Sequence, residues 1–141
     1  MPTTPWPPSN LSDCCSGELH PLALKGIRLF NAGDYFAAHE ELELAWRADE
    51  GPIRELYRGI LQVGVAYYHI RRGNYRGAVK MLRYSKVWLE PFPDHCRGVD
   101  VAQLRCDALR VESALLATPP DQLSGFDQSL FRPVRVSPPT L

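Results

Sequence analysis

The segment Ala32-Gly33-Asp34-Tyr35-Phe36-Ala37-Ala38 recurs forty residues later as Arg72-Gly73-Asn74-Tyr75-Arg76-Gly77-Ala78. In both copies a glycine and an Asp or Asn stand between two runs of helical periodicity. Glycine adopts the left-handed conformation that ends many helices, and an Asp or Asn side chain caps the helix that follows. Each copy therefore predicts a tight turn between two antiparallel helices. We expect a positive φ or a close helix contact at Gly33 and at Gly73.

Outward from these turns, apolar periodicity predicts helices and almost no strands. Five helices are expected, over residues 19–31, 35–49, 53–72, 75–89 and 100–117. The predicted fold class is all-α, a single compact bundle of about five helices built on antiparallel helix hairpins. A short solenoid is the alternative, because repeated helix hairpins also build solenoids.

Proline marks both ends of the chain and divides it into three parts. Residues 1–17 are predicted to be a Pro-rich flexible arm, and residues 18–117 the helical domain. Residues 118–141 are predicted to be an irregular C-terminal tail. Four apolar residues are expected to dock this tail: Leu123, Phe126, Leu130 and Phe131.

Composition limits the function classes open to this chain of 141 residues, which is long enough for one core. Lys plus Arg number 16 and Asp plus Glu number 16, so the formal net charge is zero. Nucleic-acid binders and polybasic membrane-surface proteins carry a basic excess, so the balance argues against both partners. No apolar run approaches the roughly 20 residues that span a bilayer, and no secretory signal is visible. We therefore expect a cytoplasmic protein with reduced thiols at its four cysteines, Cys14, Cys15, Cys96 and Cys106.

Two polar stripes are predicted to meet where the helices 35–49 and 53–72 pack together. On the first helix, His39 and Glu43 lie between two aromatic residues, Phe36 and Trp46, at helical spacing. On the second helix, polar residues recur at spacings of 3, 4 and 7: Glu55, Arg58, Gln62 and His69.

The turn at Gly51 makes these two helices antiparallel, so facing residues have numbers that sum to about 102. Glu43 then comes opposite Arg58, and His39 opposite Gln62. Buried polar groups need partners, so we expect one hydrogen-bonded network, at least half buried, with Trp46 packed over it.

This seam supplies the candidate ligand-binding residues, which are His39, Glu43, Trp46, Arg58, Gln62 and His69. One interpretation is that the network only fixes helix register, and a second is that it binds a small molecule or ion. A third is metal-dependent hydrolysis, because His39-Glu40-x-x-Glu43 is similar to the zinc-binding His-Glu-x-x-His motif. His39, Glu43 and His69 would then be the metal ligands and Glu40 the base. Arg58 opposite Glu43 would compete with such a cation, so we expect no resident metal or cofactor.

A basic stripe is predicted on one exposed face of the helix 75–89. It contains Arg72, Arg76, Lys80 and Arg83 at spacings of 4, 4 and 3, flanked by Tyr75 and Tyr84. Such a stripe is either a solvated face that pairs with acidic neighbours or a patch for an anion, a nucleic acid or an acidic partner.

Three motifs together resemble one known family. They are Phe30-Asn31-x-Gly33-x-Tyr35-Phe36-x-Ala38-His39-Glu40-x-Leu42-Glu43-x-x-Trp46, then Gly59-x-x-Gln62 through Tyr68-His69, then Gly73-Asn74-Tyr75-x-Gly77-Ala78. Their order and spacing are similar to the bacterial and archaeal family called domain of unknown function 309. The resemblance covers about residues 19–110 and implies an all-helical domain, but it implies no activity.

The sequence thus predicts a binding or scaffold-type domain with an unknown protein or small-molecule partner. A ligand or metal site on the seam, with hydrolase activity, is the alternative. Whether the protein is an enzyme and whether it forms oligomers are left open.

Overall fold

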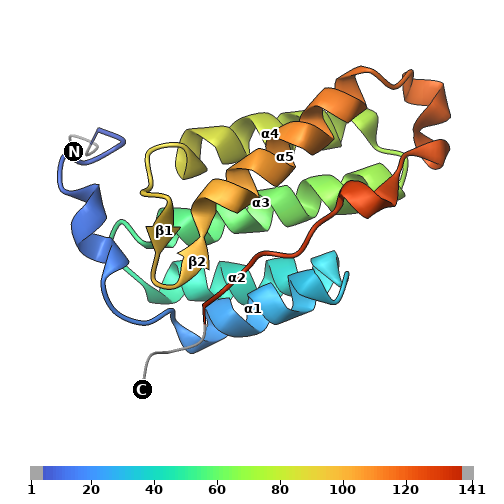
Figure 1. The fold of residues 1–141 in the computed structure, drawn as a ribbon. Helices are drawn as coiled ribbons and strands as arrows, with labels where there is room; N and C mark the ends of the chain where they lie inside the picture. The colour runs from blue at the N-terminus through green and yellow to red at the C-terminus, as the bar shows by residue number, and fades with distance from the viewer. Residues whose placement is uncertain (1–4, 138–141) are drawn as a thin grey trace.

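The computed structural model describes residues 5–137, so residues 1–4 of the predicted arm and 138–141 of the predicted tail lie outside it. Five main helices confirm the all-α prediction (Figure 1). They are α1 (Pro21–Asn31), α2 (Tyr35–Ala48), α3 (Arg54–Arg71), α4 (Tyr75–Leu89) and α5 (Val101–Leu116). Each begins and ends within two residues of the predicted bounds.

Short elements complete the described chain, and the sequence pattern did not predict them individually. A two-stranded antiparallel hairpin, β1 (His95–Cys96) and β2 (Val99–Asp100), lies between α4 and α5. Three 3₁₀ helices occur near the ends: η1 (Leu11–Cys15), η2 (Pro120–Gly125) and η3 (Gln128–Leu130). None of the helices in residues 5–137 combines the length and the apolar character that crossing a bilayer requires.

The two copies of the repeated turn have the same backbone conformation. Gly33 has φ of 83° and Gly73 has φ of 75°, which confirms the left-handed turns. Asp34 and Asn74 follow them as caps, and each side chain accepts the backbone N–H three residues later, at 3.2 and 3.0 Å. Glycine and cap together reverse the chain within a few residues, so α1 packs on α2 and α3 packs on α4 as hairpins.

Antiparallel packing of α2 and α3 follows the predicted register. The rings of Tyr35 and Tyr67 lie 5.6 Å apart, and Trp46 Nε1 donates to Glu55 Oε1 at 3.0 Å. These pairs sum to 102 and 101, as the turn near Gly51 predicts. Each of the first four helices packs mainly on its neighbour in the chain, and α5 packs on α4.

The C-terminal segment returns past α3 and α2 towards the β-hairpin (Figure 1). Leu123 and Phe126 are buried, and Phe131 stacks on Tyr67 with ring centroids 4.5 Å apart. The Asn31 side chain donates to the Val134 carbonyl at 2.9 Å and accepts the Val134 N–H at 2.8 Å. The segment is therefore tied to α1 and α3 by both apolar and polar contacts.

The N-terminal segment also makes fixed contacts, although the sequence predicts a flexible arm over residues 1–17. The Trp6 ring lies 5.5 Å from Trp88, and its Nε1 donates to the Val87 carbonyl at 2.9 Å. Leu11 is buried. Residues 6–11 of the predicted arm thus rest on α4 and the core.

One expectation about the cysteines is wrong. Cys15 and Cys96 form a disulfide, whereas reduced thiols were predicted at all four positions. The fold brings the end of η1 beside β1, so two cysteines 81 residues apart in sequence become neighbours. Cys14 and Cys106 are free.

Candidate functional site

The predicted ion pair between Glu43 and Arg58 does not form. Glu43 Oε1 instead accepts from Arg47 Nη2 at 2.7 Å, and His39 Nε2 lies 3.7 Å from Glu43 Oε2. Arg58 Nη1 lies 3.4 Å from Glu55 Oε2. Each acid therefore pairs with a base three or four residues away on its own helix, where the side chains are already neighbours. The helix register was right, but the pairing across the seam was wrong.

The predicted bond between His39 and Gln62 is also absent from residues 5–137. The buried Gln62 Oε1 has no hydrogen-bond partner among the described residues. His39 is half-exposed and turns towards Glu43 one helical turn away. The seam therefore contains separate polar groups rather than the single network that the two stripes predict.

Trp46 and Arg58 do meet, in a cluster that ties α2, α3 and α4 together. The Arg58 guanidinium lies 4.9 Å from the Trp46 ring and 4.3 Å from the Trp88 ring. Arg54 covers Trp46 at 3.9 Å and donates to its carbonyl at 3.1 Å. Cation–π contacts of this kind stabilise by about 0.5–2 kcal/mol, depending on exposure. With Trp46 also bonded to Glu55, these side chains already satisfy one another, which indicates a structural role.

His69 does not lie with His39 and Glu43 in a position where the three could bind one metal ion. Its Nδ1 is 3.3 Å from Asn74 Nδ2 at the second repeated turn, and burial lowers the pKa of His69. Among residues 5–137, one group of three or more His, Cys, Asp or Glu side chains is placed to share a metal, and its members are cysteines. His39, Glu43 and His69 do not form such a group, so the geometry does not favour the hydrolase alternative.

The basic stripe of α4 lines an open groove. Its lining consists of Tyr75, Arg76, Val79, Lys80, Arg83, Tyr84 and, from α5, Leu116. Arg72, the first residue of the predicted stripe, instead lies over the Tyr68 ring at 5.5 Å. Three cations of the predicted stripe therefore line one groove.

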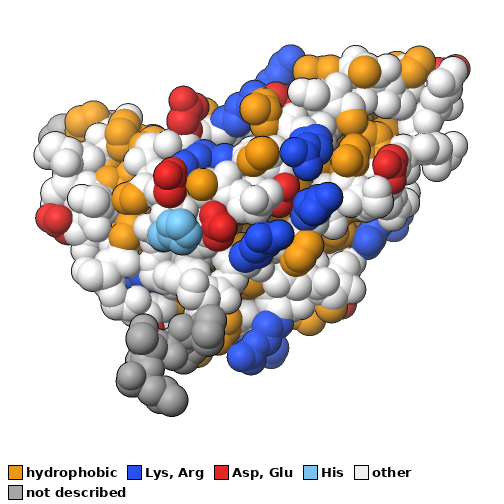
Figure 2. Space-filling view, in the orientation of Figure 1, with side chains coloured by type: hydrophobic (Ala, Val, Ile, Leu, Met, Phe, Trp, Pro, Cys, Tyr) orange, Lys and Arg blue, Asp and Glu red, His pale blue; other side chains and the backbone are white. Residues whose placement is uncertain are grey.

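Within the described chain, these three cations have no acidic partner. The ion pairs of residues 5–137 include none formed by Arg76, Lys80 or Arg83. By contrast Lys86, further along α4, pairs with Glu112 of α5. On the face of the molecule that Figure 2 shows, basic and acidic side chains lie among each other, in keeping with the formal net charge of zero. An uncompensated basic groove is therefore a local feature of α4.

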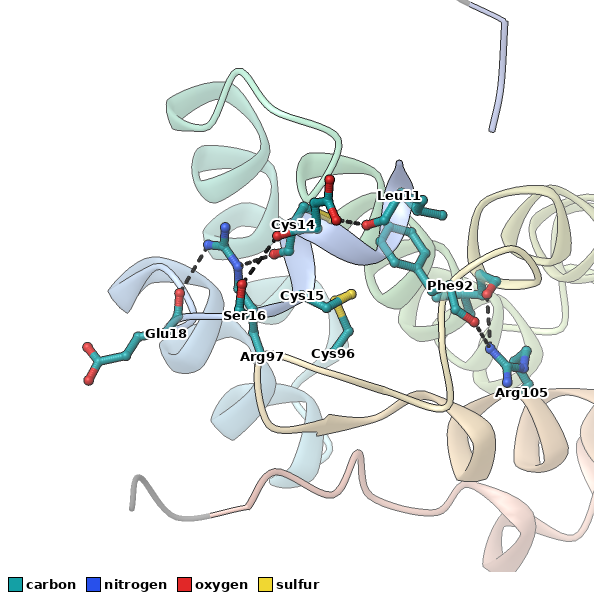
Figure 3. The surroundings of a disulfide bond; sticks show 11 residues. Leu11, Cys14, Cys15, Ser16, Glu18, Phe92, Cys96, Arg97 and Arg105 are labelled. Atoms are coloured by element: carbon teal, nitrogen blue, oxygen red, sulfur yellow. Dashed lines mark hydrogen bonds between the residues drawn. A yellow bond between two sulfur atoms is a disulfide. The ribbon is translucent and has the colours of Figure 1, made fainter. Parts of the chain in front are cut away.

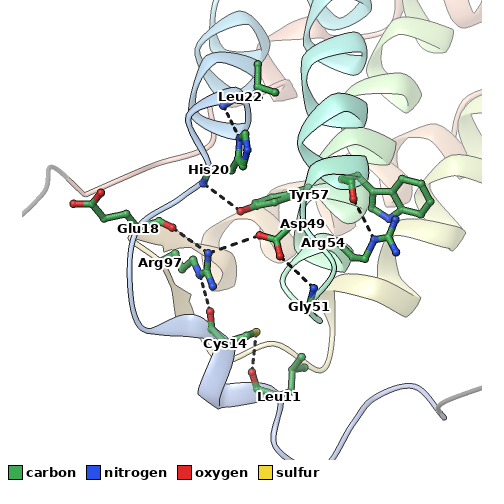
Figure 4. Close-up of polar contacts among 11 residues, drawn as sticks. Leu11, Cys14, Glu18, His20, Leu22, Asp49, Gly51, Arg54, Tyr57 and Arg97 are labelled. Carbon is green, nitrogen blue, oxygen red and sulfur yellow. Dashed lines mark hydrogen bonds and ion pairs between the residues drawn. The ribbon is translucent and has the colours of Figure 1, made fainter.

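A second constellation, at the other end of α4, was missed by the sequence analysis. Cys14 and Cys15 at the end of η1 lie beside Cys96 of β1 (Figure 3). Arg97 donates to backbone carbonyls of this segment, and its Nη1 lies 4.0 Å from Asp49 Oδ2 (Figure 4). Sequence spacing gives no direct sign of this meeting. The positive φ of Arg97 (48°) and Gly98 (84°) marks the tight hairpin turn that positions it.

Comparison with known proteins identifies the domain that carries the repeated turns. Residues 23–81 match the family described as "Domain of unknown function (DUF309)". An uncharacterized protein of Aquifex aeolicus (strain VF5) is 27% identical over 77 residues, which are 54% of this chain and 23% of that protein. The uncharacterized protein YpuF of Bacillus subtilis (strain 168) is 43% identical over 53 residues, 37% of this chain and 30% of YpuF.

The similarity to these two relatives thus spans less than a third of each relative's length. The family match runs from α1 into α4 and includes both repeated turns and the α2–α3 seam. The chain contains a DUF309 family domain, which confirms the resemblance of its motifs.

Proposed function

We propose that this protein is a binding domain whose α4 groove binds a segment of a partner protein that contains both acidic and apolar residues. The observation that carries the proposal is a set of three cations in one groove, Arg76, Lys80 and Arg83, which have no acidic partner among residues 5–137. Unpaired surface charges of one sign attract a partner of the opposite sign and speed its association.

Apolar side chains of the groove indicate a protein partner rather than a nucleic acid. Tyr84 is 46% exposed and Leu116 is 53% exposed, and both line the groove beside the cations. Lys80 Nζ lies 5.6 Å from the Tyr84 ring, so cation and aromatic face present one continuous surface. Exposed apolar side chains beside cations suit a peptide segment that has carboxylates and one apolar side chain to bury. The zero net charge of the chain also argues against a nucleic acid as the partner.

A charge-reversal experiment tests this proposal. The probe is a fluorescein-labelled helical peptide of Glu and Leu, with a Lys and Leu peptide of the same pattern as reference. Anisotropy measures binding to the protein and to the triple variant Arg76→Glu, Lys80→Glu, Arg83→Glu. We expect the triple variant to bind at least about tenfold more weakly, because each exposed ion pair contributes about 0.2–1 kcal/mol. Added salt should weaken the wild-type complex.

Arg28→Glu provides a control on α1, where the exposed arginine lies outside the groove. It should bind the acidic peptide as the wild type does. Equal losses of affinity in the Arg28→Glu control and the triple variant would refute the proposal, as would equal affinity for the acidic and basic peptides. Tighter binding of a DNA or RNA oligonucleotide than of the acidic peptide would assign the groove to nucleic acid and overturn it.

A further inference from the structure

Three cysteine sulfurs meet at one point of the fold. The Sγ atoms of Cys14, Cys15 and Cys96 all lie within 4.8 Å of one another. Cys96 is buried, and the other two are half-buried. The disulfide uses Cys15 and Cys96, so the third thiol stands beside a bond in which it has no part.

Other contacts hold the same segments together independently of the disulfide. Arg97 N donates to the Cys15 carbonyl at 2.9 Å, and Arg97 Nε donates to the Cys14 carbonyl at 2.7 Å. Arg97 Nη1 donates to the Glu18 carbonyl at 3.1 Å, and Leu11 anchors η1 in the core (Figure 4). These contacts do not depend on the disulfide, so we expect the three thiols to stay in place when it is reduced.

We propose that the reduced cluster of Cys14, Cys15 and Cys96 binds a thiophilic divalent cation of the zinc class. Thiolate is the ligand that Zn²⁺ and related soft cations favour. Tetrahedral Zn–S bonds of about 2.3 Å place two sulfurs about 3.8 Å apart, which the 4.8 Å cluster accommodates with small adjustments. Three protein ligands leave the fourth position for water or a small anion.

Arg97 supplies one positive charge beside this site. Three thiolates and one divalent cation have a net charge of −1, and Arg97 brings a guanidinium to the backbone of the same segment. Asp49 Oδ2 lies 4.0 Å from Arg97 Nη1, so the same guanidinium also offsets the negative charge of this carboxylate. The thiols release their protons to solvent when the cation binds.

The disulfide-bonded protein is the oxidised state of the same site, and in this state the site does not bind the cation. A low-molecular-weight disulfide accepts two electrons from the thiolates of Cys15 and Cys96, and it leaves as two thiolates. One S–S bond forms between the cysteines while the S–S bond of the small disulfide breaks. The cation loses two of its three ligands and dissociates, and Cys14 regains a proton. Binding is therefore gated by the redox state of the solution.

Titration of reduced, desalted protein under anaerobic conditions tests the proposal. Co²⁺ is the probe, because cobalt–thiolate charge transfer absorbs in the near ultraviolet, and Zn²⁺ competition gives the affinity. We expect one Co²⁺ per chain and displacement by Zn²⁺. Adding oxidised glutathione should release one Zn²⁺ for each Cys15–Cys96 disulfide that forms, measured with a zinc-responsive dye and by mass spectrometry.

Cys14→Ser is the decisive variant, because it keeps the disulfide and so keeps the oxidised fold. Its oxidised form should melt as the wild type does, while its reduced form binds Zn²⁺ at least tenfold more weakly. Cys106→Ser, which removes the exposed thiol outside the cluster, should bind normally.

Two other results would overturn the proposal. Unchanged affinity in Cys14→Ser would show that the third thiol is not a ligand. Loss of helical circular dichroism on reduction would show that the Arg97 bonds do not hold the site together.

Discussion

Two buried tyrosines of α3 differ in whether their hydroxyl groups have a partner. Tyr57 and Tyr67 have completely buried side chains. The Tyr57 hydroxyl accepts the His20 N–H at 3.2 Å, whereas the Tyr67 hydroxyl has no partner among the described residues. Replacing each by phenylalanine removes one oxygen and keeps the ring. Tyr57→Phe should therefore destabilise the fold, whereas Tyr67→Phe should not.

The magnitudes follow from the two environments. A buried polar group without a partner costs roughly 1–3 kcal/mol, so Tyr67→Phe should be neutral or stabilise the fold by up to about 1 kcal/mol after lost contacts are deducted. Tyr57→Phe removes one hydrogen bond and should destabilise by about 0.5–1.5 kcal/mol. Burial, and next the charge of Asp107, raise the pKa of Tyr67, so its hydroxyl stays protonated at neutral pH.

Urea unfolding of the wild type, both variants and the double variant measures these effects. The residues are ten positions apart on one helix, about 15 Å, so the effects of the two changes should add. A loss of 1 kcal/mol or more in Tyr67→Phe would refute the reasoning. It would indicate that the hydroxyl donates to Asp107 Oδ2, which is itself buried without a partner among the described residues.

Three further changes test the turns, the C-terminal segment and a half-buried histidine. Gly73→Ala should destabilise by about 1–2 kcal/mol in urea unfolding because the φ of Gly73 is 75°, and no atom lies close enough for a steric clash to contribute. Gly125→Ala should be neutral, because Gly125 has the same open space without a positive φ. Asn31→Ala should cost about 1–3 kcal/mol and speed proteolysis near Val134, since it removes both bonds to that residue. Burial lowers the folded-state pKa of His69 below 6.5, so protonation favours the unfolded chain. Wild-type stability should fall as pH drops through 6.5 towards the folded-state pKa, and His69→Gln should flatten that fall in unfolding midpoints at pH 7.5 and 5.5.

The helices and their register could be predicted because their determinants are local. Apolar periodicity marked each helix, and Gly33 with Asp34 ended one helix and capped the next. A short turn near Gly51 then fixed which residues of α2 and α3 face each other. Register depends on this length alone, so the sum near 102 needed no knowledge of side-chain conformation.

Pairing within the seam could not be predicted in the same way. Glu43 lies at the right height to meet Arg58, but Arg47 is one turn away on the same helix and reaches it first. Which of two nearby arginines pairs with Glu43 depends on the side-chain rotamers and on the rotation of each helix about its axis. Sequence spacing contains neither quantity.

The cysteine cluster lies further beyond local reasoning. Cys15 and Cys96 are 81 residues apart, and the four helices α1 to α4 lie between them in the chain. The one local sign is the turn at Arg97 and Gly98, where the φ values of 48° and 84° suit a two-residue hairpin. Such a turn predicts a hairpin but not what lies against it.

The two copies of the repeated turn differ in what covers them, and this difference bears on function. Tyr35 of the first copy is buried, with the Phe131 ring of the C-terminal segment 6.2 Å away. Tyr75 of the second copy is half-exposed and lines the α4 groove beside Arg76. The tyrosine of this motif is thus covered by the chain's own C-terminal segment in the first hairpin and left partly exposed in the second. A partner segment would bring to the second hairpin what the chain's own tail brings to the first, with Arg76 in place of Phe36 selecting acidic residues.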